Sequence, residues 1–179
     1  EAHVLFDVLH DSVLDTAALE RLNAYQAIIL PDMRLMSDQA KNSIDSYVHN
    51  GGKILATGFT AAYSSKGQLL ETVDLKCAGI NQIQDFIAYA QGMYLRIRPE
   101  DKQTLGGFED VDIVHLNGDL LACELDQTDT PYLGYIPAQM FGPPEKCYYT
   151  EETNIPGVIT NRYGQGIYIF VPWQFGEQY

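Results

Sequence analysis

A turn that directly follows a buried strand is where an α/β hydrolase exposes its nucleophilic Ser or Cys, beside a helix N-terminus. In this sequence the corresponding turn is residues 56–61, Ala-Thr-Gly-Phe-Thr-Ala. It contains no Ser or Cys, and neither Thr57 nor Thr60 has an evident base that could activate its hydroxyl. A plain turn that requires the backbone freedom of Gly58 explains the pattern better. We therefore predict no catalytic residue at this turn.

The cysteines and histidines form no recognisable catalytic or metal-binding pattern. The three cysteines are widely spaced, which favours neither a disulfide framework nor a zinc site, and only Lys76 beside Cys77 could stabilise a thiolate. His10 lies near Asp7 and Asp11, but three such residues at a strand end are more typical of solvated positions. We expect no metal and no cofactor.

Aromatic side chains gather in the C-terminal half of the sequence. A Pro-rich stretch contains Tyr132, Tyr135, Phe141, Tyr148 and Tyr149, and Trp173 follows the last apolar run. Such side chains stack on sugars, anchor subunit interfaces or pack in a core. The candidate binding residues are therefore Trp173, Tyr148, Tyr149 and Tyr132.

Composition excludes several classes of protein. The 179 residues carry 11 basic and 24 acidic side chains, a formal charge of −13. The basic residues are scattered, which argues against nucleic acid and against an anionic membrane surface as partners. The longest apolar run, residues 167–171, is far shorter than the ~20 residues of a membrane-spanning helix. We expect a single globular domain that is a segment of a longer protein, in a compartment that the sequence does not indicate.

The first third of the sequence alternates strand and helix signals. The pattern predicts a strand at His3–Leu9 and a helix capped by Asp15 or Thr16, with apolar residues at 19, 22 and 25. The continuous apolar run Ala27–Leu30 then favours a central parallel strand that is buried on both faces.

A helix and a further strand follow this run. Ser37 can cap a helix with an apolar stripe at 40, 44, 47 and 48, and Asn50-Gly51-Gly52 supplies a left-handed stop. Lys53–Thr57 returns as a strand. Strand, helix and strand together predict a βαβ unit with a parallel pair.

The remainder of the sequence is predicted to be β-rich. Residues 64–67 form a turn, and Ile83–Tyr89 is a short helix or an extended piece. Two hairpins are expected, one joining Val111–Leu116 to Leu120–Leu125 through Asn-Gly-Asp and one joining Val158–Thr160 to Ile167–Val171 through Tyr-Gly-Gln-Gly. We thus divide the single domain 1–179 into a βαβ part (1–62), an irregular and helical connection (63–110) and a β-rich part (111–179).

Three of these pieces resemble a known family. Leu19–Pro31 with its YQAIILPD, Ser37–Gly58 (SDQAKNSIDSYVHNGGKILATG) and Ile155–Pro172 (IPGVITNRYGQGIYIFVP) resemble the β-galactosidase trimerisation domain of family 42 type glycoside hydrolases. The shared features are an apolar strand that ends in Pro, a helix closed by Asn-Gly-Gly before a strand that ends in Gly, and a Tyr-Gly-x-Gly hairpin.

The resemblance implies a flavodoxin-like sheet, related to class I glutamine amidotransferases, with Gly58 standing about where their catalytic Cys would be. It also implies a non-catalytic domain of a larger β-galactosidase-like enzyme. The expected partners are the enzyme's own catalytic barrel or a neighbouring subunit, in a homo-oligomer such as a trimer.

Two alternatives of different classes remain open. One is a carbohydrate-binding module that uses Trp173 and the tyrosines between Tyr132 and Tyr149. The other is a degenerate amidotransferase-like hydrolase, for which Thr57, Thr60 and Cys77 are the candidate residues.

Overall fold

The computed structural model describes residues 4–16, 18–88, 93–125, 130–138, 142–143 and 152–175. In this part of the chain, seven strands form one mixed sheet in the order β1-β2-β9-β8-β7-β4-β5, and β3 and β6 form a small antiparallel sheet. In chain order, the elements are α1 (Ser12–Thr16), α2 (Ala18–Leu22), β1 (Ile28–Pro31), α3 (Asp38–His49), β2 (Lys53–Thr57), the 3₁₀ helix η1 (Lys76–Ala78), β3 (Ile80–Ile87), β4 (Met93–Arg96), α4 (Pro99–Thr104), β5 (Ile113–Leu116), β6 (Leu120–Leu125), β7 (Thr130–Ile136), β8 (Pro156–Tyr163) and β9 (Gly166–Val171).

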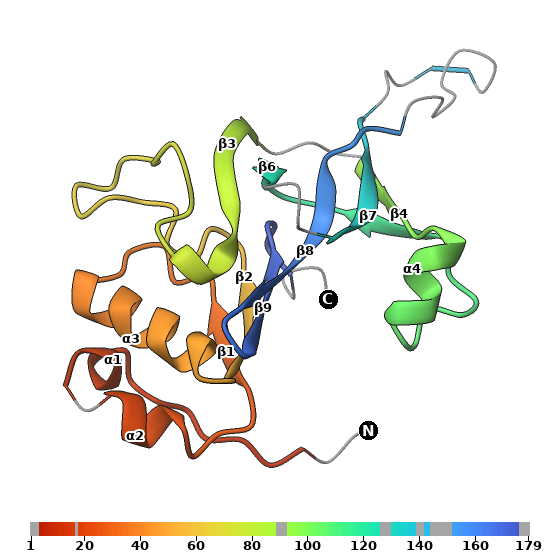
Figure 1. Ribbon diagram of the computed structural model, residues 1–179. Helices are drawn as coiled ribbons and strands as arrows, with labels where there is room; N and C mark the ends of the chain where they lie inside the picture. Colours follow the sequence, from red (N-terminus) through yellow and green to blue (C-terminus); the bar gives the residue numbers. More distant parts are fainter. Residues whose placement is uncertain are drawn as a thin grey trace.

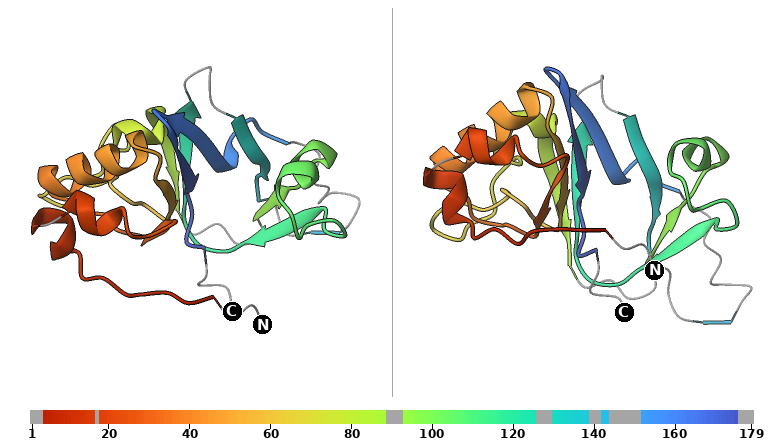
Figure 2. Two further views of the ribbon diagram at one scale, coloured as in Figure 1. Left: turned by 60° about the horizontal axis from the view of Figure 1, so that its bottom comes forward. Right: turned by 90° about the horizontal axis from the view of Figure 1, so that it is seen from below.

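The expected α/β architecture is confirmed at this level, with few helices. The three N-terminal helices lie together on one side of the large sheet, and α4 lies on the other side (Figures 1 and 2). Within the described residues, no helix is both long and apolar enough to span a bilayer.

The βαβ unit formed by β1, α3 and β2 is confirmed. The Ser37 hydroxyl accepts a hydrogen bond from the Ala40 amide at 3.0 Å, which caps α3. All four residues of the predicted apolar stripe are buried. Gly51 ends the helix with a φ of +106°, and β1 pairs with β2 in parallel from Ile28 opposite Ile54.

The predicted Tyr-Gly-Gln-Gly hairpin is also confirmed, and it joins the two ends of the chain. β8 and β9 pair antiparallel around Gly164, which has a φ of +60°. β9 then pairs in parallel with β2, with Ile167 opposite Lys53. The C-terminal hairpin therefore completes the sheet that the βαβ unit begins.

Two clusters of buried apolar side chains flank this sheet. The larger one lies between the sheet, α1–α3 and the β3-β6 pair, and includes Ile44, Phe59 and Tyr168. The smaller one is formed mainly by β4 and β7 together with Val171 and Trp173. The connecting region 63–110 supplies strands to both, since β3 and β4 lie within it, and β3 adopts the extended alternative for the residues from Ile83.

The predicted hairpin around residues 117–119 is wrong. β5 and β6 are both strands, but β5 pairs with β4 and β6 pairs with β3. The reason is the burial of β6 on both faces: Leu120 belongs to the smaller cluster, whereas Leu121 and Cys123 belong to the larger one. A two-stranded hairpin alone would leave one of these faces in water.

Three expectations for the N-terminal third are corrected. Residues 4–10 form no strand, and Val4, Leu5, Phe6 and Val8 are exposed. The first helical residues begin at Ser12, in α1, rather than after a cap at Asp15 or Thr16, and α2 follows from Ala18. β1 lies at an edge of the sheet rather than at its centre, so that Ile29 is 63% exposed.

Replacing Gly166 by Ala is expected to lower the free energy of unfolding by roughly 1–3 kcal/mol. A Cβ at this position would collide with the backbone carbonyl groups of Val48 and Gly52, which cannot move without displacing the end of α3. Gly106→Ala is the matched control, because a Cβ there meets no atom within 4 Å. Urea denaturation followed by circular dichroism measures both, and equal midpoints would contradict this account of the helix–sheet contact.

Candidate functional site

The turn after β2 is where catalytic chemistry was sought, and the structure leaves no room for a nucleophile there. Gly58 has a φ of +63°, and its amide donates to the Trp173 carbonyl oxygen at 2.9 Å. A Cβ at Gly58 would lie 2.5 Å from Oδ1 of Asp32. The same oxygen accepts a hydrogen bond from the Phe59 amide at 2.8 Å. The carboxylate of Asp32 therefore occupies the space that a serine or cysteine side chain would need.

The two threonines of this turn are buried, and the Thr60 hydroxyl bonds to the backbone. Thr60 is fully buried, and its hydroxyl accepts from the Met33 amide at 3.1 Å. The hydroxyl oxygen also lies 2.8 Å from the Thr57 carbonyl oxygen and 3.2 Å from that of Leu30, to which its proton can be donated. Thr57 is 8% exposed. The hydroxyl of Thr60 thus ties the end of β1 to the end of β2 and has no general base beside it.

An ion pair covers the carboxyl ends of these parallel strands, where α/β proteins usually bind ligands. The Arg34 guanidinium donates to both carboxylate oxygens of Asp32 at 2.9 to 3.2 Å. It also stacks over the Phe59 ring at 4.6 Å from the centroid. The hydrogen bond to Asp32 raises the pKa of Arg34, so the guanidinium stays charged. Asp32 therefore has a structural role: it accepts a hydrogen bond from the Phe59 amide and pairs with Arg34.

Cys77 is buried in the larger cluster and is not a reactive thiol. Desolvation raises its pKa well above the ordinary range, and the nearby Asp45 carboxylate raises it further. Asp45 accepts hydrogen bonds from the amides of Lys76 and Cys77 at 3.3 and 2.8 Å, which holds the start of η1. Burial also raises the pKa of Cys123 to about 12. Both thiols are neutral at physiological pH, whereas a nucleophilic cysteine needs a thiolate.

The polar residues around His10 are not gathered into a site. His10 is exposed, and its Nδ1 lies 2.9 Å from Oγ of Ser12 and 2.9 Å from a carboxylate oxygen of Asp11. Asp7 instead accepts a hydrogen bond from the Tyr25 hydroxyl at 2.9 Å. Among the described residues, no three or more His, Cys, Asp or Glu side chains converge as metal ligands would.

The candidate binding aromatics are placed unevenly. Trp173 is 4% exposed, and its Nε1 donates to the Gly157 carbonyl oxygen at 2.9 Å. Tyr132 is half-buried against the smaller cluster, and Tyr148 and Tyr149 lie outside the described residues. A ring that stacks on a sugar needs an open face, so the burial of Trp173 does not favour this role for it.

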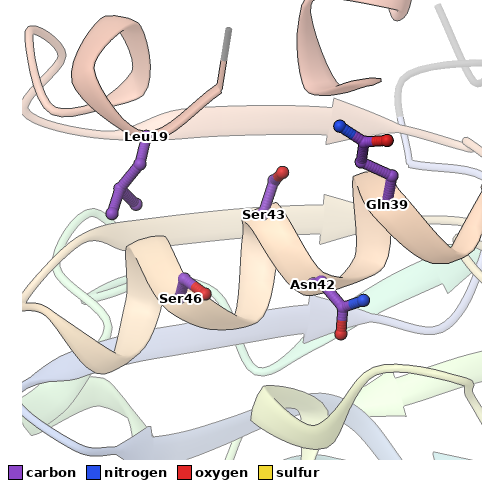
Figure 3. A pocket seen from close by; sticks show the side chains of 5 residues that line it. All are labelled: Leu19, Gln39, Asn42, Ser43 and Ser46. Carbon is purple, nitrogen blue, oxygen red and sulfur yellow. The ribbon is translucent and has the colours of Figure 1, made fainter. Parts of the chain in front are cut away.

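A shallow depression lies on the outer side of the helical layer, between α2 and α3 (Figure 3). It is lined by Leu19, Gln39, Asn42, Ser43 and Ser46, whose side chains are uncharged. Hydroxyl and amide groups without a neighbouring base or acid can form hydrogen bonds but cannot drive acid–base or nucleophilic chemistry.

Exposed apolar side chains are the surface feature that sequence reasoning missed. Val4, Leu5, Phe6 and Val8 are 73–100% exposed, and Ile29 on the edge strand β1 is 63% exposed. The sequence pattern predicts a strand at residues 3–9 and a strand buried on both faces at residues 27–30, and neither expectation places these side chains in water. An apolar run that the fold leaves in water is instead typical of a surface that another chain or domain covers.

A double-mutant cycle between Gly58 and Asp32 tests the crowding of this turn. Gly58→Ala is expected to lower the free energy of unfolding by about 1–2 kcal/mol more in the native protein than in the Asp32→Gly variant, because removing the Asp32 side chain removes the collision. Gly67→Ala is the matched control, since Gly67 also has a positive φ but faces open space. It should carry the backbone strain alone and show no coupling to Asp32. Additive effects at Gly58 and Asp32 in urea denaturation would refute the crowding.

The buried thiols should resist alkylation and make the protein sensitive to alkali. Iodoacetamide near pH 8 is expected to leave Cys77 and Cys123 unmodified in the folded protein and to modify both in strong urea, as read by mass spectrometry.

Because the pKa values of Cys77 and Cys123 are raised in the folded state, the unfolded chain loses these thiol protons first as the pH rises. Stability should therefore be fully present below about pH 8.5, the ordinary thiol pKa, and fall above it.

The slope of that fall is up to about 1.4 kcal/mol per pH unit for each buried thiol. Cys77→Ala should reduce the slope between about pH 9 and about pH 10, where an unfolded thiol has ionised and the folded one has not. An unchanged slope in urea unfolding at these pH values would show that the folded thiol is not protected.

With this geometry in place, comparison with known proteins identifies the N-terminal half. The family model described as the β-galactosidase trimerisation domain matches residues 8–88. No curated protein sequence matches the chain. The matched segment contains α1, α2, the βαβ unit and the turn after β2, together with β3.

Solved structures share the fold over most of the chain. The β-galactosidase of Bacillus circulans sp. alkalophilus aligns with a TM-score of 0.62 at 16% identity, over 84% of this chain and 20% of that enzyme. The β-galactosidase of the haloarchaeon Halorubrum lacusprofundi gives 0.59 at 16% identity, over 87% and 20%. A cytoplasmic protein of Salmonella typhimurium LT2 gives 0.63 at 12% identity, over 96% and 71%.

The chain thus spans about a fifth of the length of the β-galactosidases with which it shares a fold. The fold similarity extends to both halves, whereas the family model covers the half that holds the βαβ unit. The resemblance predicted from the sequence motifs is therefore confirmed: residues 8–88 match the family model of the β-galactosidase trimerisation domain, and most of the chain shares its fold with β-galactosidases of solved structure.

Proposed function

We propose that this chain is a non-catalytic, subunit-associating domain of a larger glycoside hydrolase of the family 42 β-galactosidase type. The match of residues 8–88 to the trimerisation domain family carries the proposal. The turn after β2 supports it independently, because Asp32 fills the position that a nucleophile would need. An accessory domain needs no nucleophile, so the two observations agree.

The activity of the parent enzyme belongs to this proposal. The chain corresponds to about a fifth of the β-galactosidases of similar fold, which leaves most of such an enzyme for a catalytic barrel. A glycosidase needs two carboxylates that face one sugar. In the proposed parent, these two acids lie outside residues 1–179, and the sugar that it cleaves is a galactoside.

The proposed partners are the parent's own catalytic barrel and a neighbouring subunit, in a homo-oligomer of three. The large apolar side chains that the fold leaves exposed support a contact surface, since exposed apolar patches mark interaction sites. Among them are side chains of residues 4–8, Ile29 of the edge strand β1 and Ile113 of the opposite edge strand β5. Contact at either edge of the sheet would remove such side chains from water.

We further propose that residues 1–179 are one accessory domain of the glutamine-amidotransferase-like, flavodoxin-like type. The three parallel strands β1, β2 and β9 with helices on one face support this relationship. The continuity of the sheet from β1 to β5 supports a single unit, because it joins the two hydrophobic clusters.

A sugar-binding role has less support. Trp173, the one tryptophan of the chain, is covered by its neighbours, and Tyr132 packs against the same cluster. A hydrolase role has even less support, since Cys77 is a buried neutral thiol and the Thr60 hydroxyl is bonded to the backbone. No observation supports either alternative as strongly as the match of residues 8–88 to the family model supports the associating role.

Light scattering after size-exclusion chromatography tests the associating role in the full-length parent enzyme. We expect a mass of three subunits for the intact enzyme and a lower mass for a version that lacks residues 1–179. The isolated 20.0 kDa chain is expected to hydrolyse no nitrophenyl galactoside, because it supplies no pair of catalytic acids. Deletion of a folded domain of equal size elsewhere in the parent serves as the control for a general loss of stability.

Two results would overturn the proposal. An intact enzyme that elutes as a clean monomer would remove the associating role. A coding sequence that contains no barrel-sized region of alternating strands and helices beside this chain would remove the proposed parent enzyme.

A further inference from the structure

We draw no further inference here: the strongest candidate, the exposed apolar surface formed by residues 4–8 and by the free edge strand β1, carries nothing because nothing in the described part of the chain shows what covers it.

Discussion

The parallel pairing of β9 with β2 is the interaction on which the rest of this structure depends. β2 comes from the N-terminal βαβ unit, whereas β9 comes from the C-terminal hairpin, so this one ladder joins the two parts of the chain into a single sheet. The pairing is close because Gly166 has no side chain and lies against the carbonyl groups of Val48 and Gly52. The Ile167 amide donates to the Gly52 carbonyl oxygen at 3.1 Å, which holds the start of β9 at the end of α3.

The same pairing decides what the carboxyl ends of the parallel strands can do. In this arrangement the chain after β9 lies beside the turn after β2, and the Trp173 carbonyl oxygen accepts from the Gly58 amide. Asp32, at the end of β1, accepts a hydrogen bond from the Phe59 amide of that turn and pairs with Arg34. The carboxyl ends of the parallel strands, where α/β proteins often bind ligands, are therefore occupied by polar groups that hydrogen-bond to one another. A fully bonded set of polar groups rigidifies a fold, but it offers little to a substrate.

The distribution of apolar and charged side chains on the surface also bears on the role of this chain. A parallel sheet is normally covered on both faces and is rarely left with an open apolar edge. Here the helices α1–α3 cover one face, and β1 with its exposed Ile29 forms an edge in the described part of the chain. The charge of −13 would keep copies apart at most of the surface, whereas uncharged apolar positions allow approach. Such a distribution supports the proposed associating role.

Much of the fold could be predicted because it depends on contacts between residues close in sequence. The Ser37 cap of α3, the stop at Gly51 and the turn at Gly164 each need only a few neighbouring residues, and each is confirmed. That the turn after β2 contains no Ser or Cys is a fact of the sequence, whereas the contact of Asp32 with this turn could not be predicted, since Asp32 and Gly58 lie far apart in sequence.

The sequence by itself determined the βαβ unit, the C-terminal hairpin and the family resemblance, because these are encoded by local periodicity and by turn residues at set spacings. Only the tertiary structure decided which strands pair and which apolar residues stay in water. β6 shows the physical reason: any two strands can form backbone hydrogen bonds, so its partner is chosen by the burial of both its faces between two distant clusters. Residues 4–9 show the converse, since an apolar run becomes a strand only where another strand lies beside it.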